Sequence, residues 1–476
     1  MRDLVPRWPG DPARQSVILG LVLLAGALAG FGGSMWVVAA LVATGLGFLA
    51  YAAPGVLLAA YVAIPFYKGA LQPFSPVDVT VVLAALNGAS LLPLIMRQTA
   101  LRRSAAVLWV ATAVLVVGGV AWAMEGNLAL GTAAGWLGLV AVPMVAAIRV
   151  SADPGGARSF VVTLAMFSVA FVGLGALALL GSGSGDRLLL LGANTIGVAR
   201  AACLLPVIGA AYLTASGPRS IRWPLIALGP PAIVVAIASG SRGPVLFAIV
   251  VVAAGAISVG IRNGGIGHRR TVGVSVLGAL AAVGVVALLP ELPVASLLRF
   301  EDLLTFVLGT RGEGDTSTAA RLTLFDAAWQ MFASKPLFGW GTAGFAWLSP
   351  LDEALRGNTY PHNVLLQFAA EFGVIGLILA VGLFLVALNR RLPADPMWHA
   401  IRYIFVFWLM NAMISGDIYS DRMLWGLTLL LAFRPNGPQL TVDAKARSRL
   451  VAPRGWTTFA RAKVAPASAL IAPASS

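Results

Sequence analysis

Apolar stretches of about 20 residues recur along this chain from Ser16 to Phe433, and they constrain its fold more than any other feature. A bilayer's hydrocarbon core is about 30 Å thick, so roughly 20 helical residues cross it. Helices satisfy their own backbone hydrogen bonds in that environment. At 59% hydrophobic and 11% charged residues, with a mean hydropathy of +0.87, the chain is too apolar for a water-soluble globule. We therefore predict an all-α polytopic integral membrane protein with about 12 to 14 transmembrane helices.

The basic residues indicate how these helices are oriented. The net charge is +14, but 23 of the 33 Lys and Arg residues lie in the amino terminus, in alternate loops and in the tail after Phe433. The alternate loops are Arg97 to Arg103, Arg149 to Arg158, Arg219 to Arg222, Arg262 to Arg270 and Arg390 to Arg402. Cytoplasmic loops of membrane proteins carry such an excess. This distribution favours a membrane protein over a nucleic-acid binder, with both termini cytoplasmic.

The same pattern divides the chain into four parts. Residues 1–290 are predicted to hold transmembrane helices 1 to 11, and residues 291–361 a large extracytoplasmic loop with an amphipathic helix. Residues 362–434 hold helices 12 to 14, and residues 435–476 form a disordered basic tail on the cytoplasmic side. Residues 17–31 resemble a signal peptide, because a small-x-small pattern follows an apolar stretch, but we predict a retained first span.

A short polar interruption at residues 239–244 separates two apolar runs. Pro244 suits the first position of a helix and Gly243 the cap, so Arg242 is predicted at a helix N-terminus. The helix dipole disfavours an exposed cation there by about 0.3 to 1 kcal/mol. Arg242 is therefore either an arginine that extends to the membrane edge or part of an anion site.

The longest polar interruption runs from Pro290 to His362 and contains eight of the nineteen acidic residues. Within it, Thr318 is predicted to cap an amphipathic helix that lies on the membrane or covers a cavity. Its apolar positions, spaced by three and four residues, are Leu322, Phe325, Trp329 and Phe332. Arg321 then lies in the first turn, either as an anion ligand or as a solvated charge paired with Asp315 or Asp326.

His362 is predicted at a third helix start, because Asn363 is a good cap for the apolar run that begins at Val364. Lone histidines are more often structural than catalytic. However, we predict three cationic or protonatable groups at three outward helix N-termini. The positive ends of the helix dipoles disfavour this arrangement unless an anion binds among the three groups. Helix N-termini and arginines together make a strong anion site, which a diphosphate would fit.

These segments resemble the O-antigen ligase and polymerase family. The resemblance rests on Ser241-Arg242-Gly243, on Arg321 followed by Pro336-Leu337-Phe338-Gly339-Trp340-Gly341, and on two further segments. These are His362-Asn363-Val364-Leu365-Leu366-Gln367 and Glu371-Phe372-Gly373-Val374-Ile375-Gly376. The motifs have the order and spacing of that family and are all predicted on the same side of the membrane. The resemblance covers roughly residues 195–390.

The resemblance implies a metal-independent glycosyltransferase at the outer face of the inner membrane. Its donor would be a glycan on undecaprenyl diphosphate, and its acceptor a hydroxyl of a lipid anchor or a growing polysaccharide. Arg242 and Arg321 would bind the diphosphate and stabilise its developing charge, and His362 would be the general base. Arg200, predicted just inside the outer boundary, would be a further ligand of the diphosphate, and Asn363 is grouped with the substrate-binding residues.

Other sequence features limit the kinds of binding site that this chain could contain. The segment from Gly339 to Phe345 is Gly-rich but lacks the Lys-Ser/Thr ending of a P-loop, so we predict a tight turn. Trp340 or Trp347 is available there to stack on sugar rings. The single Cys203 lies in an apolar run, which argues against a disulfide framework and a Cys-based metal site. We expect no metal, no cofactor and no nucleic-acid partner.

Two alternatives remain at this stage. A transporter or flippase of a lipid-linked saccharide predicts polar residues near the bilayer midplane, where Asn87 and Asn411 are the clearest, and an internal repeat, which is not visible. A membrane scaffold would leave the three cationic helix starts without a reason. Ligase and polymerase share the motifs and differ in acceptor, so the sequence does not separate them.

Overall fold

The computed structural model describes residues 53–75, 77–91, 103–153, 155–181, 188–215, 217–263, 316–348, 359–393 and 395–433. The predicted spans near 17–31, 35–50 and 271–290 lie outside these residues. Within them the structure is helical, with an isolated bridge between Leu190 and Ala193 in place of any sheet. The all-α polytopic class is confirmed.

Seven helical segments among the described residues are long and apolar enough to cross a membrane. They are α7 with η2 (Arg103–Trp122), α8 to α10 (Gly126–Ala152), α11 (Gly156–Gly181), α12 (Thr195–Thr214), α13 with α14 (Arg219–Ala238), α20 (Val364–Leu388) and α21 (Pro396–Ser415). Shorter apolar helices are α5 (Val79–Ala89), α22 (Arg422–Ala432) and Arg242–Ser258, which is part of α15 (Arg242–Asn263). The sequence predicts spans near 54–66, 104–124, 131–148, 159–181, 223–238, 244–261, 364–388, 402–415 and 422–433, and two more that begin near Asp78 and Thr195. Each of these coincides with such a helix or with the bent pair described next.

Helices α3 (Pro54–Val62) and α4 (Ile64–Leu71) meet at a bend of 78°. Pro65 is the second residue of α4. A proline has no backbone N–H, and its ring clashes with the carbonyl of the residue four positions earlier, so it favours a kink or break of the helix at this point. The pair counts as an eighth membrane span if both helices belong to one crossing.

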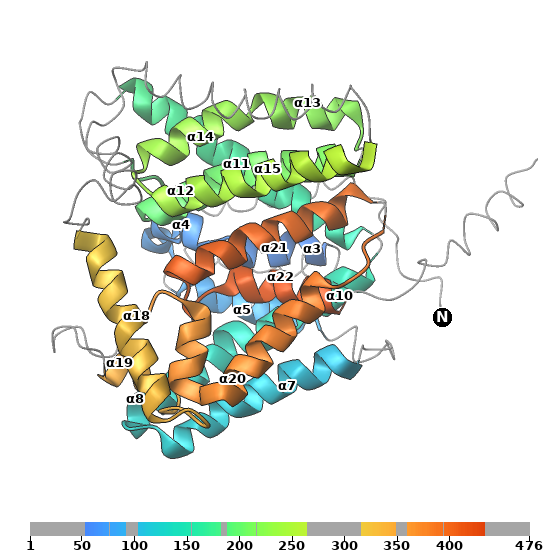
Figure 1. Cartoon of the computed structure of the whole chain (residues 1–476). Helices are drawn as coiled ribbons and strands as arrows, with labels where there is room; N and C mark the ends of the chain where they lie inside the picture. The colour runs from blue at the N-terminus through green and yellow to red at the C-terminus, as the bar shows by residue number, and fades with distance from the viewer. Residues whose placement is uncertain are drawn as a thin grey trace, which may run out of the picture. The chain divides into compact units, whose positions relative to one another are not determined.

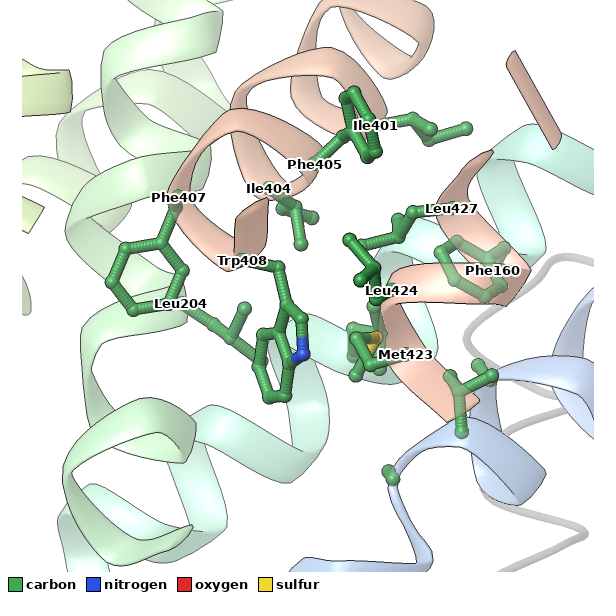
Figure 2. Packing of buried hydrophobic residues seen from close by; sticks show 14 of the residues in the cluster. Phe160, Leu204, Ile401, Ile404, Phe405, Phe407, Trp408, Met423, Leu424 and Leu427 are labelled. Carbon is green, nitrogen blue, oxygen red and sulfur yellow. The ribbon is translucent and has the colours of Figure 1, made fainter. Parts of the chain in front are cut away.

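The apolar core is built around α12, which packs against α11, α14, α15 and α21. Figure 2 shows Phe407 and Trp408 of α21 extending toward Leu204 of α12, with Met423, Leu424 and Leu427 of α22 on the other side of α21. All of these side chains are buried. In Figure 1, α12, α15 and α21 run in roughly the same direction, and α18 (Thr316–Ser334) crosses that direction steeply at the left.

Helix α18 is the predicted loop helix, with two corrections. It begins at Thr316, so Arg321 is its sixth residue and not part of the first turn. Asp, Thr and Ser are all good caps, and residues 315–318 therefore offer several possible starts. The stripe that packs on the protein is Leu324, Ala328 and Met331, against Phe345 and Ala370. Two residues of the predicted stripe face away, with Leu322 52% and Trp329 56% exposed, whereas Phe325 and Phe332 are half-buried.

The small residue Ala328 determines which face of α18 packs against α20. Ala328 and Ala370 are both fully buried. Their short side chains let α18 lie close against α20, with which it makes its main helix contact. The bulkier stripe of Leu322 and Trp329 is equally apolar, so periodicity does not distinguish the two faces.

Helix α20 is broken at Gly373, whose φ is +63° and ψ −157°. Because α20 is broken here, backbone groups of α20 form hydrogen bonds with the turn at residues 336–343, called the 336–343 turn below. Trp340 N–H donates to Ala370 C=O at 3.1 Å, and Gly341 N–H donates to Glu371 C=O at 2.7 Å. Val374 N–H donates to Pro336 C=O at 2.7 Å. Two of the motifs noted in the sequence therefore pair with each other through their backbones.

We expect Gly373→Ala to unfold this junction. A Cβ at Gly373 would lie 2.3 Å from Leu337 O, and its positive φ disfavours any L side chain. Together these effects should cost about 2 kcal/mol or more of unfolding free energy. Thermal unfolding of the purified protein in detergent measures this loss.

The matched control is Gly382→Ala in the same helix, where the nearest contact of the new Cβ would be an ordinary 3.6 Å to Leu108. That variant should be as stable as the wild type. Equal melting temperatures for the two variants would contradict the assigned role of Gly373.

Candidate active site

His362 lies immediately before α20, next to the predicted cap. The Asn363 side chain accepts hydrogen bonds from the backbone N–H groups of Leu365 at 3.0 Å and Leu366 at 3.1 Å, which confirms it as the N-cap. His362 itself has a φ of +58°, an uncommon conformation for a residue other than glycine. Such strained residues concentrate at functional sites, where the surrounding structure holds them.

The imidazole of His362 lies against the ring of Tyr360, with centroids 4.3 Å apart. Burial, and then the positive charge of Arg321, lower the pKa of His362 to about 4. The ordinary value is about 6.5. His362 is therefore a neutral imidazole at neutral pH and is able to accept a proton.

Arg321 comes to His362 from α18, although the two are far apart in the chain. Its charge acts on His362, on Tyr360 and on Arg200. Because α18 packs on α20, the position of Arg321 depends on that helix contact. The structure thus brings together two of the three groups that the sequence predicted at helix starts.

Arg200 belongs to the same group of residues. It is the sixth residue of α12, which Asn194 caps by accepting from Gly197 N–H at 2.8 Å. Its Nη2 donates to Ser415 C=O at 3.1 Å, and its guanidinium lies 5.0 Å from the centroid of the Trp408 ring. The groups that act on it electrostatically include Asp421, Tyr360 and Arg321.

Arg242 is placed at the same end of α21. Helix α15 begins at Arg242 itself, so the prediction of Gly243 as cap and Pro244 as first residue was wrong by two positions. Proline is tolerated throughout the first turn, where backbone N–H groups have no partner within the helix. A Cβ at Gly243 would lie 2.4 Å from Ile414, the residue before Ser415. Arg242 therefore starts its helix beside the segment to which Arg200 is bonded.

Trp340 is half-buried, and part of its surface is already in use. Its Nε1 donates to Met331 C=O at 3.0 Å and to Ser334 Oγ at 3.1 Å. The Lys335 ammonium lies 3.7 Å from its ring centroid, in a cation–π contact. By comparison, Trp347 is 36% exposed.

Sequence reasoning missed the polar connection between α21 and α22. Asp417 Oδ1 accepts from Gln367 Nε2 at 3.1 Å, and Asp421 Oδ1 accepts from Trp408 Nε1 at 2.6 Å. Burial raises the pKa of Asp421, and the charge of Arg200 lowers it in part. Burial and then the charge of Asp417 raise the pKa of Tyr360. The signal in the sequence was the presence of two aspartates among the six residues that separate two apolar helices.

Several buried polar atoms of these segments have no hydrogen-bond partner among the residues that the structure describes. They are Thr359 Oγ1, His362 Nδ1, Arg200 Nε, Asp421 Oδ2 and Glu371 Oε1. Buried polar groups in folded proteins are nearly always paired. A polar ligand that entered here would gain hydrogen bonds that the described part of the chain does not supply.

Comparison with known proteins identifies part of the chain. Residues 226–381 match the family model described as O-antigen ligase. The matched segment contains Arg242, Arg321 and His362, and it ends within α20. A search of curated proteins found no match. The chain thus carries, over residues 226–381, a domain of the O-antigen ligase family.

Proposed function

We propose that this protein transfers a glycan from an undecaprenyl-diphosphate carrier to an acceptor hydroxyl at the outer face of the cytoplasmic membrane. The family and the apolar helices indicate a multi-pass inner-membrane enzyme of the ligase and polymerase type that acts on a lipid-linked glycan. The observation that supports the finer proposal is the neutral imidazole of His362 among arginines from other helices. In this proposal both termini are cytoplasmic and α18 lies on the outer side.

The reaction follows from these groups. His362 accepts the proton of the acceptor hydroxyl as its oxygen attacks the anomeric carbon of the donor sugar. The bond between that carbon and the diphosphate oxygen breaks, and its electron pair stays on the diphosphate. Arg321 and Arg242, with Arg200, stabilise the negative charge that develops there. The products are the glycosylated acceptor, the polyprenyl diphosphate and a proton, which His362 releases to water.

Binding of the anionic donor prepares His362 for this step. Without a ligand, Arg321 disfavours protonation of the imidazole. A diphosphate beside Arg321 would offset that charge, so the pKa of His362 should rise toward its ordinary value. The imidazole would thus be neutral before the donor binds and a stronger base once it has bound.

The transporter alternative finds no support among the described polar residues that suggested it. Asn87 and Asn411 each donate from the amide nitrogen to the backbone carbonyl four residues earlier in their own helices, at 2.9 and 2.8 Å. Arg242, His362 and Asp421 lie instead at or just before helix starts. That placement suits a reaction at one membrane surface.

Reconstitution into proteoliposomes tests the proposal. With a labelled glycan on polyprenyl diphosphate and a hydroxyl acceptor outside, the label should move to the acceptor and the free polyprenyl diphosphate should accumulate. Transfer to a lipid anchor would indicate a ligase, and transfer to a second carrier-linked glycan a polymerase. Movement of intact donor across the bilayer, without cleavage, would instead establish a transporter.

A further inference from the structure

Glu371 is a fully buried carboxyl group in α20, two residues before the break at Gly373. The mechanism proposed above does not use it. Isolated buried charges are costly, and buried carboxyl groups need hydrogen-bond partners. Its partners come from two segments that are distant in the chain.

One oxygen of Glu371 joins these two segments. Oε2 accepts a hydrogen bond from the Tyr419 hydroxyl and one from Ala343 N–H at 3.2 Å. Ala343 N–H also lies 3.0 Å from the Tyr419 oxygen. Ala343 belongs to the 336–343 turn that follows α18, and Tyr419 to the connection between α21 and α22.

Neighbouring contacts reinforce this junction. The Glu371 carbonyl accepts from Gly341 N–H, and a Cβ at Gly339 would lie 2.3 Å from the Glu371 carbonyl carbon. One turn earlier in α20, the Gln367 side chain accepts from Ile418 N–H at 3.0 Å and donates to Asp417. Burial and then the Glu371 carboxyl raise the pKa of Tyr419 well above its usual value, so its hydroxyl remains a donor.

Each segment that meets at Glu371 carries or contacts part of the candidate site. Helix α20 begins next to His362, the 336–343 turn continues from α18 with Arg321, and the α21–α22 connection carries Asp417 and Asp421. We propose that Glu371 is a positioning residue: its carboxyl group holds α18 and the α21–α22 connection against α20, and so fixes Arg321 relative to His362. This inference rests on the proposed function for its effect on rate, but its geometry can be tested without turnover.

His362 provides the direct readout. The chain has three histidines, so nuclear magnetic resonance of ¹⁵N-histidine-labelled protein in nanodiscs follows few imidazoles. His268→Asn and His399→Asn assign the His362 signal by elimination. Arg321 of α18 acts directly on His362, and Tyr360 lies against its ring. The charges that act on Tyr360 are Asp417 and Asp421 of the α21–α22 connection, Arg200 of α12 and Arg321.

The decisive variants are Glu371→Gln and Glu371→Leu. Glutamine keeps an oxygen that accepts both hydrogen bonds, so His362 should still titrate near 4 and transfer should stay within about threefold of wild type. Leucine removes both bonds, so Arg321 should move away and the pKa of His362 should rise toward 6.5. Transfer should then fall by about tenfold to 100-fold, as expected when reacting groups are misplaced.

Asp326→Asn is the matched control, because Asp326 is an exposed carboxylate of α18 that bonds Gln330 on the same helix. It should leave both readouts unchanged. Tyr419→Phe removes one hydrogen bond with little change in volume, and it should shift the pKa of His362 in the same direction by a smaller amount. It replaces the leucine variant if that protein does not fold.

These experiments distinguish failure of the positioning role of Glu371 from failure of the proposed function. A merely structural role would reduce the amount of folded protein without moving the His362 titration. If folded Glu371→Leu, or Tyr419→Phe in its place, titrates at the wild-type pH, the positioning role is wrong. If the wild-type protein in proteoliposomes transfers no glycan, the proposed function fails, while the titration still decides whether Glu371 places Arg321.

Discussion

Replacing His362 with alanine is expected to lower glycan transfer by about 100- to 10,000-fold, the usual contribution of a general base. The imidazole is neutral at physiological pH because burial and Arg321 lower its pKa to about 4. It can therefore take the proton of an acceptor hydroxyl without first losing one. Alanine removes this base, and Asn363 cannot replace it because its side chain is engaged in capping α20.

The measurement is transfer from a labelled carrier in proteoliposomes, normalised to the amount of folded protein. His399→Ala is the control, because that imidazole bonds Pro393 C=O near the start of α21, in a different part of the chain. It should retain transfer within about twofold, as expected for a residue outside the site. Transfer by His362→Ala at the wild-type rate would show that His362 takes no part in the mechanism.

Arg321→Lys is expected to reduce transfer by about 100-fold, although it keeps the charge. A guanidinium presents paired donors that match two phosphate oxygens, and an ammonium acts as a point charge. Lysine should also keep the pKa of His362 low. Arg321→Gln removes the charge as well, so it should be at least as inactive and should alter the pH dependence.

The pH profile of transfer shows in which direction the loss of the Arg321 charge shifts the pKa of His362. In the wild type, kcat/KM should fall as the pH decreases through about 4, where His362 becomes protonated. Without the positive charge of Arg321, protonation is easier, so in Arg321→Gln the acid limb should move to higher pH, toward 6.5. Burial still lowers the pKa, so the shift should be partial. An unmoved limb would show that Arg321 does not act on His362.

Arg242→Lys separates charge placement from phosphate binding. Arg321 is the charged group that lowers the pKa of His362, whereas Arg242 starts a different helix beside the end of α21. Loss of transfer without a shift of the acid limb is therefore expected for Arg242→Lys. Full activity with lysine would show that Arg242 acts only through its positive charge.

The sequence alone determined the class of the fold and the bounds of most helices, because both depend on local properties. A helix that crosses a bilayer requires a long apolar run, and its ends are marked by caps such as Asn194 and Asn363. Helix α20 was predicted at its observed bounds for this reason. The order of Arg242, Arg321 and His362 also carried the family resemblance without any structure.

Only the tertiary structure decided which residues meet. Two faces of α18 are apolar, and Ala328 packs on α20 because small side chains allow close approach, a preference that hydrophobic periodicity does not encode. The meeting of Tyr360 with His362, of Arg200 with Ser415, and of Glu371 with Tyr419 and Ala343 likewise depends on how the chain packs. Most of these contacts join segments far apart in the chain, so their geometry is a property of the packed helices and not of any local stretch of sequence.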